Sequence, residues 1–351
     1  MNNNNNKELT MNKLTKTGVS ALCGSLAAVA SANAGELTVT GGVDMTWTNI
    51  SDSQTGNPIG MGSNVSFSGS GELDNGIGFT LSIDYTNGAA LSNTRVVATV
   101  PSLGDIRIDQ GMSGTGMDRY DDKTPNVWEE ANGTGLGTGI KTVVGSSVGS
   151  TIEWKPNMLP EGYTAYIAYS PKADSGSAAD KATANTDSGV GSGYDIMLDV
   201  DGGTVLGMDG LSVFAGMSKT EQANGVTYTG DRSQYTMGAN YAVGSVTVGY
   251  QYSRDNLQNK VAASTSFYEN NMYGITFQIN DDLSIGYNHI ESEQENLGAD
   301  NVTAEATSFQ IAYTMGGASI RLAEASMDDG KYQTGASQDK DATTLSVALA
   351  F

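Results

Sequence analysis

The residues that could carry chemistry in this sequence are mostly carboxylates and a smaller set of basic side chains. The 351-residue chain has 39 aspartates and glutamates against 18 lysines and arginines, a formal net charge of −21. It has one histidine, His289, and one cysteine, Cys23. A lone histidine argues against a Ser-His-Asp catalytic set and against a histidine-rich zinc site. The acidic balance argues against nucleic acid as a partner, since phosphate binding needs clustered lysine and arginine; it favours attraction of cations instead.

Two acidic runs could hold a divalent cation through carboxylate oxygens, namely Asp118–Asp122 and Asp328–Asp329. Neither has the spacing of an EF-hand loop, and no glycine- and aspartate-rich calcium repeat occurs. The glycine-rich stretch 133–139 lacks the lysine of a phosphate-binding loop. We therefore expect solvated acidic loops, no metal site and no cofactor, with Ca²⁺ at the acidic loops as the weaker alternative.

Several charged residues stand at alternate positions within apolar segments. Val96, Ala98 and Val100 share one face of an extended segment, which leaves Arg95 on the other face because successive side chains of a strand point to opposite sides. The same parity separates further charged side chains from apolar neighbours: Asp44, Asp84, Asp105, Arg107, Asp109, Glu153, Asp195, Asp199 and Arg321. The elements that position these charges should therefore be strands with one apolar and one polar face.

Alternation of this kind recurs along the chain and predicts about sixteen strands. The last segment places Leu345, Val347, Leu349 and Phe351 on one face, with small or polar residues on the other. The remaining candidates span 36–48, 63–73, 77–86, 94–100, 104–110, 150–155, 163–170, 194–200, 211–218, 234–243, 245–253, 272–279, 283–290, 307–314 and 317–324. An even number near sixteen lies within the range of single-chain outer-membrane barrels.

The connections between these segments alternate in length. Short turns rich in glycine, asparagine and aspartate join the strand pairs, as tight hairpins require. Longer polar stretches lie between the pairs, the longest covering 111–149, whereas the turn expected at 201–210 is longer than the other short turns. Short turns at one end and long loops at the other are the expected asymmetry of a transmembrane barrel.

The N-terminus predicts export from the cytoplasm. Residues 11–34 contain a basic start, a short apolar run and the motif Ala32-Asn33-Ala34 before Gly35, as in a secretory signal peptide. The apolar run is shorter than the ~20 residues that a spanning helix needs. We expect cleavage between Ala34 and Gly35, with Met11 as the initiator, so that 1–34 is removed and 35–351 forms one domain.

A soluble β-sandwich would show the same period of two, so the two faces have to be compared. The polar face is rich in threonine, serine, glycine and aspartate, while aromatic residues stand near strand ends on the apolar face. Pairs such as Tyr163 and Tyr169, or Tyr273 and Tyr287, fit aromatic girdles at two membrane interfaces. This favours an all-β transmembrane antiparallel barrel with a wet interior over a sandwich.

With the signal peptide, three segments together resemble the general bacterial outer-membrane porin family. They are the first strand Gly35–Gly42, the hairpin VVATVPSLGDIRIDQG at 96–111, and the last strand ending in Phe351. The resemblance implies a sixteen-stranded barrel in the outer membrane of a Gram-negative bacterium, a homotrimer surrounded by lipid, and a water-filled channel. It also implies that the long third loop, here 111–149, folds inward and narrows that channel.

In this family, acids on the third loop face basic side chains on the opposite wall. The candidates for the constriction here are Arg95, Arg107, Arg321, Asp118, Asp121, Asp122, Glu129 and Glu130, with Asp44, Asp84, Asp105 and Asp109 as further charges facing the lumen. We expect a non-enzymatic general diffusion channel for small hydrophilic solutes and ions with a mild preference for cations. The alternatives are a substrate-specific channel, although no aromatic ladder marks the inward positions, and a surface structural or adhesive barrel.

Overall fold

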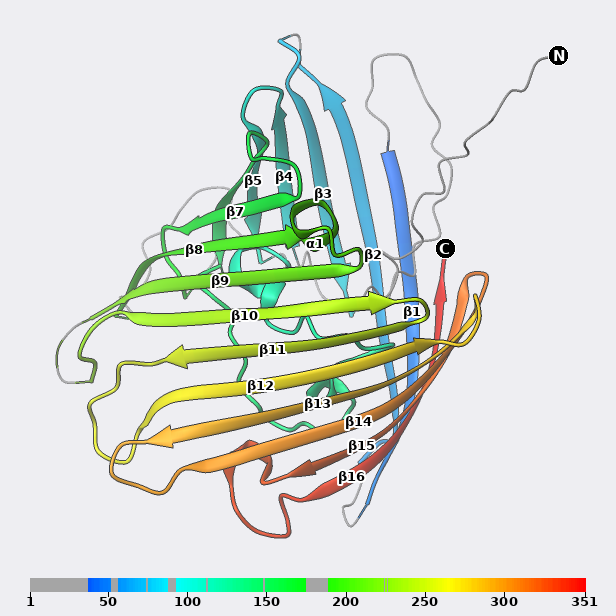
Figure 1. Ribbon diagram of the computed structural model, residues 1–351, viewed down its shortest axis with the longest axis vertical. Coiled ribbons are helices and arrows are strands. Elements are labelled where there is room, and N and C mark those ends of the chain that lie inside the picture. Colours follow the sequence, from blue (N-terminus) through cyan, green and yellow to red (C-terminus); the bar gives the residue numbers. More distant parts are fainter. Residues whose placement is uncertain are drawn as a thin grey trace.

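The described part of the chain forms one closed antiparallel β-barrel (Figure 1). The computed structural model describes residues 37–51, 56–73, 75–87, 93–111, 113–147, 149–174, 189–223, 225 and 227–351. The segment 1–34 and its expected cleavage site at Ala34 and Gly35 lie outside the described residues. Among the described residues, no helix is both long enough and apolar enough to cross a membrane.

Sixteen strands appear in the described residues, and each pairs with its neighbour in sequence. They are β1 (Leu37–Ile50), β2 (Ile59–Glu72), β3 (Gly78–Thr86), β4 (Asn93–Val100), β5 (Gly104–Gln110), β6 (Ser150–Pro156), β7 (Tyr163–Ser170), β8 (Val190–Asp201), β9 (Leu211–Gln222), β10 (Arg232–Val243), β11 (Val246–Asn256), β12 (Thr265–Gln278), β13 (Leu283–Asn296), β14 (Val302–Met315), β15 (Ala318–Asp328) and β16 (Lys340–Ala350). β1 pairs with β16 and closes the barrel. The predicted strand number and antiparallel barrel are confirmed.

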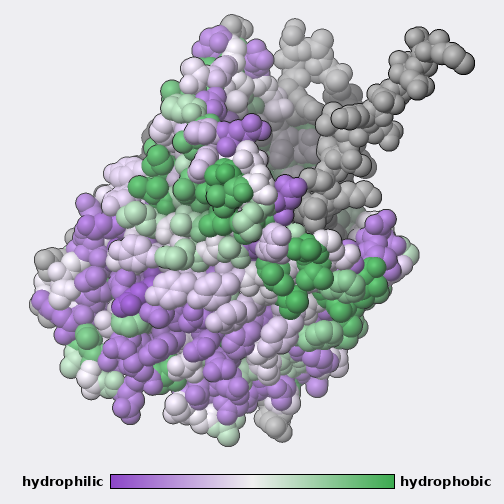
Figure 2. Space-filling view, in the orientation of Figure 1, coloured by the Kyte–Doolittle hydropathy of each residue, from purple (hydrophilic) through white to green (hydrophobic). Residues whose placement is uncertain are grey.

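The strand register gathers apolar side chains on the outside of the barrel. Trp47 of β1 lies opposite Leu345 of β16, and the same lateral row continues through Leu322, Ile311, Ile285 and Phe277. Inward neighbours alternate with this row and are buried: Ser346, Arg321 and Ala312. Figure 2 shows apolar patches on the visible outer face, as expected where strands meet lipid.

The C-terminal residue adds one more backbone pairing to the barrel seam, the junction of β1 and β16 that closes the barrel. β16 ends at Ala350, but the Phe351 backbone N–H donates to the carbonyl oxygen of Gly41 at 3.0 Å. The Phe351 ring lies against Gly41, where an added Cβ would come within 2.8 Å of it. Glycine at 41 therefore leaves room for the terminal ring on the outer face of β1.

The long turn at 201–210 contains a short helix that the sequence pattern did not predict. α1 (Gly202–Leu206) begins after Asp201, whose Oδ1 accepts a hydrogen bond from the Thr204 N–H at 2.8 Å. Such a side-chain acceptor satisfies one of the N–H groups that a helix start leaves unpaired. Gly207 follows with φ of 69° and ends the helix in the left-handed conformation that glycine adopts without strain.

Candidate functional site: a lumen narrowed by loop three

The long connection after β5 folds into the barrel, as the family resemblance implies. We call the described residues 113–147, with 149, loop three; it contains two short 3₁₀ turns, η2 (Gly116–Tyr120) and η3 (Ala131–Gly133). Met117, Tyr120, Ala131 and Val143 are fully buried. Their contacts are with inward side chains of the strands, for example Tyr120 with Phe214 of β9 at 5.4 Å between ring centroids. The loop therefore packs on the inner wall and reduces the open cross-section of the lumen.

Side-chain amides on the wall hold the loop backbone. Gln251 of β11 accepts from the Lys123 N–H at 2.7 Å and donates to the Tyr120 carbonyl at 2.7 Å. Gln310 of β14 makes the same kind of two-way contact with the backbone of Glu129. Similar amide contacts come from Gln234, Asn270 and Asn288. Buried backbone groups must be paired, so these amides let an irregular segment lie inside the barrel.

The two limbs of loop three meet at a neck, and both of them hydrogen-bond to one buried carboxylate, that of Asp195. Asp195 of β8 is fully buried. Its Oδ2 accepts from the Met117 N–H at 3.0 Å and the Ser147 hydroxyl at 2.9 Å, and its Oδ1 accepts from the N–H and hydroxyl of Ser146 at 2.9 and 2.8 Å. The entering and the leaving limbs of the loop are thus bound to the same side chain.

Three arginines gather near the start of the loop. Arg107 of β5 and Arg119 of the loop both form ion pairs with Glu153 of β6, at 3.2 and 2.5 Å. Arg95 of β4 pairs with Asp109 at 3.2 Å. Two sequence-predicted arginines, Arg95 and Arg107, therefore stand on the wall beside the loop root. Arg119 joins them from the loop itself, a contact that strand parity cannot reveal.

A second charged group lies across β15, β16 and β1. Arg321 donates through Nη2 to Asp44 Oδ2 at 2.9 Å, and the Ser346 hydroxyl donates to the other Asp44 oxygen at 2.6 Å. The Arg321 guanidinium lies 5.1 Å from the ring centroid of Trp128 on loop three. The predicted residues Arg321 and Asp44 thus meet each other and the loop, away from the Arg95 and Arg107 group.

The acids of loop three differ in their partners and in their ionisation. Asp118 accepts from the Gly114 N–H at 2.7 Å. Burial, with the neighbouring Glu130 carboxylate, raises the pKa of Glu129 to about 7, against the opposing effect of Arg321. Burial and the Glu130 and Asp121 carboxylates raise the pKa of Asp122 well above the usual carboxyl range. Some carboxyl groups of the loop are therefore protonated, and hence uncharged, at neutral pH.

The remaining predicted charges lie elsewhere along the strands. Asp105 accepts from the Thr99 hydroxyl at 2.8 Å beside the short β4–β5 turn, so it does not join the loop. Asp84 of β3 lies half-buried opposite Ser66 in the strand register. No group of three or more His, Cys, Asp or Glu in the described ranges could hold a metal ion.

The profile of the Gram-negative porin family matches residues 18–351. The chain belongs to the Gram-negative porin family. No curated protein matches its sequence. As a porin barrel, the protein is located in the outer membrane and forms a channel there.

Solved porin-like structures share the fold at low sequence identity. An outer-membrane-expressed OmpT of Vibrio cholerae has a TM-score of 0.66 and 12% identity, with 93% of this chain and 100% of that chain covered. An anion-selective porin from Comamonas acidovorans gives 0.66 and 14%, covering 90% and 99%. OmpF of Salmonella typhi, in complex with daunomycin, gives 0.64 and 14%, covering 91% and 98%. Identities this low establish a shared fold, while the side chains of this porin set its own chemistry.

Proposed function

We propose that this porin is a general diffusion channel that passes small hydrophilic solutes and ions without catalysis and mildly prefers cations. The acids of loop three and of the inward wall carry the proposal together, since the wall acids Asp44, Asp109, Glu153, Asp195 and Asp199 outnumber Arg95, Arg107 and Arg321. Within 113–147 the acids Asp118, Asp121, Asp122, Glu129 and Glu130 outnumber Arg119, Lys123 and Lys141. Arg119 and Lys123 are moreover paired with wall acids, Glu153 and Asp199. A pore whose fixed charge is negative sorts ions in favour of cations.

The preference is mild for two reasons. The raised pKa values of Asp121, Asp122 and Glu129 leave part of the acidic charge of loop three neutral at pH 7, and Arg95 and Arg107 place positive charge beside the root of the loop, where Asp109 and Glu153 partly balance it. The barrel itself does not decide the sign of selectivity, because the Comamonas acidovorans porin has the same fold and is described as anion-selective. Selectivity in this chain therefore depends on its own lumen charges.

A reversal-potential measurement in a planar bilayer tests this proposal. With a KCl gradient, the sign of the zero-current potential shows which ion crosses faster. We expect a cation preference at pH 7 and solute fluxes into liposomes that fall with solute size whatever the solute's class. Anion preference would overturn the charge argument, and a channel that passes one solute while excluding others of the same size would favour a substrate-specific channel. No unitary conductance would favour a structural or adhesive barrel.

We also propose that the porin works as a homotrimer. One of the similar Vibrio cholerae OmpT structures is described as a trimer form. On the outer face of β1 and β2, Gly41 and Gly71 lie beneath the rings of Phe351 and Phe79 of the same chain, so any surface offered there to a neighbouring subunit is aromatic. Native mass measurement in detergent should give three copies, and a monomer alone would contradict this assembly.

The single histidine of the sequence stands outside the lumen. His289 stands on the outer-facing side of β13, with its ring centroid 6.0 Å from that of Tyr273, so it does not face the lumen acids. A diffusion channel needs no nucleophile or base, and transport assays without turnover of the solute would agree with this role.

A further inference from the structure

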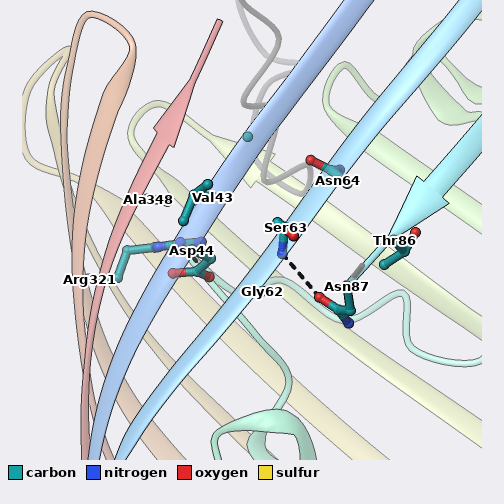
Figure 3. A pocket seen from close by; sticks show the side chains of 10 residues that line it. Val43, Asp44, Gly62, Ser63, Asn64, Thr86, Asn87, Arg321 and Ala348 are labelled. Carbon is teal, nitrogen blue, oxygen red and sulfur yellow. Dashed lines mark hydrogen bonds and ion pairs between the residues drawn. The ribbon is translucent and has the colours of Figure 1, made fainter. Parts of the chain in front are cut away.

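A recess opens in the lumen wall along β16, β1 and β2, with Arg321 reaching it from β15 and Thr86 from the end of β3 (Figure 3). Its volume is about 250 Å³. This exceeds the roughly 150 Å³ cavity that holds a benzene ring, so one sugar-sized ring fits. Its polar side chains include Asp44, Asn64, Asn87 and Arg321. Asp44 and Arg321 belong to the lumen group that faces loop three, so the recess borders the path of a solute.

The two charges in the recess neutralise each other. Arg321 donates to Asp44 at 2.9 Å, and Figure 3 shows the two side chains meeting in front of β1. Both the carboxylate of Asp44 and the guanidinium nevertheless have hydrogen-bonding capacity left, since each carboxylate oxygen accepts more than one bond. The buried Arg321 Nε has no partner among the described residues. A charged solute would have to compete with this ion pair, whereas a neutral solute would not.

Two carboxamides complete the polar lining. The Asn87 Oδ1 accepts from the Ser63 N–H at 3.0 Å, while the Asn87 N–H donates to the Ser63 carbonyl at 2.7 Å. These bonds hold Asn87 in a left-handed conformation, φ 54°, which asparagine tolerates. Its Nδ2 and the whole Asn64 carboxamide make no hydrogen bond to a described residue. The lining therefore offers side-chain donors and acceptors that no described residue occupies.

Glycine keeps the floor of the recess open. Gly42 and Gly62 lie on inward positions of β1 and β2, paired with Asn64 and Asp44 respectively. A Cβ at 62 would come 3.5 Å from the Asn87 Oδ1, and one at 42 would come 3.6 Å from the Asn64 Oδ1. Side chains at these positions would occupy the space in front of the two carboxamides.

We propose that this recess is a weak binding subsite for a neutral polyhydroxylated solute, such as a monosaccharide. A sugar hydroxyl both donates and accepts, which matches the mixed set of Asn64, Asn87, Asp44 and Arg321. The ion pair stays intact, and the lining bears no net charge that would select an ion. The proposal rests on the diffusion channel proposed above and adds a solute class to it. The subsite lies in the wall, so occupation slows passage without closing the pore.

Two measurements with D-glucose test the subsite. In planar bilayers, glucose should add saturable noise to the ion current with millimolar affinity, as expected for a few hydrogen bonds in water. Saturation-transfer NMR on the detergent-solubilised porin should show binding even where no current is measured. The double variant Asn64→Ala with Asn87→Gly, in which glycine keeps the left-handed conformation at 87, should weaken binding about tenfold or more. Ser68 lies on an inward position of β2, the strand of Asn64, but outside the recess. The Ser68→Ala porin should therefore bind glucose as the wild type does.

The outcomes separate this inference from the channel proposal. Current without a saturable glucose effect, or an effect that the double variant keeps, overturns the subsite while the channel stands. Glucose binding by NMR without conductance supports the subsite and overturns the channel. Saturable binding of glycine, acetate or methylammonium in place of glucose overturns the assignment to a neutral polyhydroxylated solute.

Discussion

Replacing Asp195 by asparagine tests how loop three is held in the lumen. At present one carboxylate oxygen binds the N–H and hydroxyl of Ser146, and the other binds the Met117 N–H and the Ser147 hydroxyl. In Asp195→Asn, the amide oxygen can keep the Ser146 contacts. The new NH₂ group then faces the Met117 N–H, donor against donor, while the Ser147 hydroxyl can rotate and accept.

The free energy that the closed neck loses in Asp195→Asn follows from the loss of the negative charge and of one hydrogen-bond partner. Hydrogen bonds to a charged group contribute about 1.5–3 kcal/mol, and neutral ones about 1 kcal/mol. The neutral amide also costs less to bury, which offsets part of the loss. We therefore expect the closed neck to lose about 2–4 kcal/mol, which raises the population of an open neck by roughly 30- to 1,000-fold. The ladder of β8 does not depend on this side chain, so the change should stay local.

Single-channel recording in a planar bilayer measures the consequence. The Asp195→Asn porin should show stronger open-channel noise and additional conductance levels, because a loosened loop changes the width of the constriction. Asp199→Asn, on the same strand, is the matched control. Its carboxylate is partly exposed and pairs with Lys123, and such pairs contribute about 0–1 kcal/mol.

A steady, wild-type current from Asp195→Asn would refute the role of this carboxylate at the neck. Heat-modifiability on gels establishes separately whether the variant barrel has formed. If it has not formed, the double variant Ser146→Ala with Ser147→Ala removes two of the four bonds and leaves the charge in place. That variant should show the same kind of noise at smaller amplitude, and a quiet channel would again refute the reasoning.

Three further predictions concern charge and assembly. Because the pKa of Glu129 is raised to about 7, this carboxyl is neutral below that pH and charged above it. The cation preference measured by reversal potential should therefore grow from pH 6 to pH 8. It should grow less in the Glu129→Gln porin. Glu153→Gln leaves Arg107 and Arg119 without their shared counter-charge and should shift the reversal potential toward anions; an unchanged value would contradict this. Phe351→Ala removes the ring at the barrel seam and should lower the temperature at which the folded band disappears on gels, whereas an unchanged temperature would show that the ring adds no stability.

The strand number could be predicted from the sequence, but several strand ends could not. Alternation identified a strand over 283–290, while β13 runs on to Asn296. The added part carries Glu291, Glu293 and Glu295 on one side and polar residues on the other. Such a segment continues the hydrogen-bonded ladder beyond the apolar band, where neither face carries apolar side chains and the period of two disappears. β14 likewise begins at Val302, five residues before the predicted start at 307. There the inward side chains Ala304 and Ala306 are buried while the outward positions hold Thr303 and Glu305, so the apolar face is the inner one and the pattern of the membrane band is reversed.

The position of charges on the wall could also be predicted, but their partners could not. Strand parity assigned Arg95, Arg107 and Arg321 to the polar face, and each meets an acid that the structure brings to it. The amides that hold the loop, such as Gln251 and Gln310, bind backbone groups far away in sequence. Backbone partners have no residue signature, so the available signal was the presence of amides at inward strand positions.

The neutral amides that anchor loop three keep their strength when the salt concentration outside the cell changes. Contacts between exposed opposite charges weaken as salt rises, because the screening length falls to about 8 Å at physiological ionic strength. Bonds from Gln251, Gln310 and Asn288 to the loop backbone carry no net charge and do not weaken in this way. The charged anchors Asp195 and Glu153 are almost fully buried, where screening is small. The width of the constriction should therefore stay constant with salt while its selectivity declines, because selectivity depends on the more exposed charges.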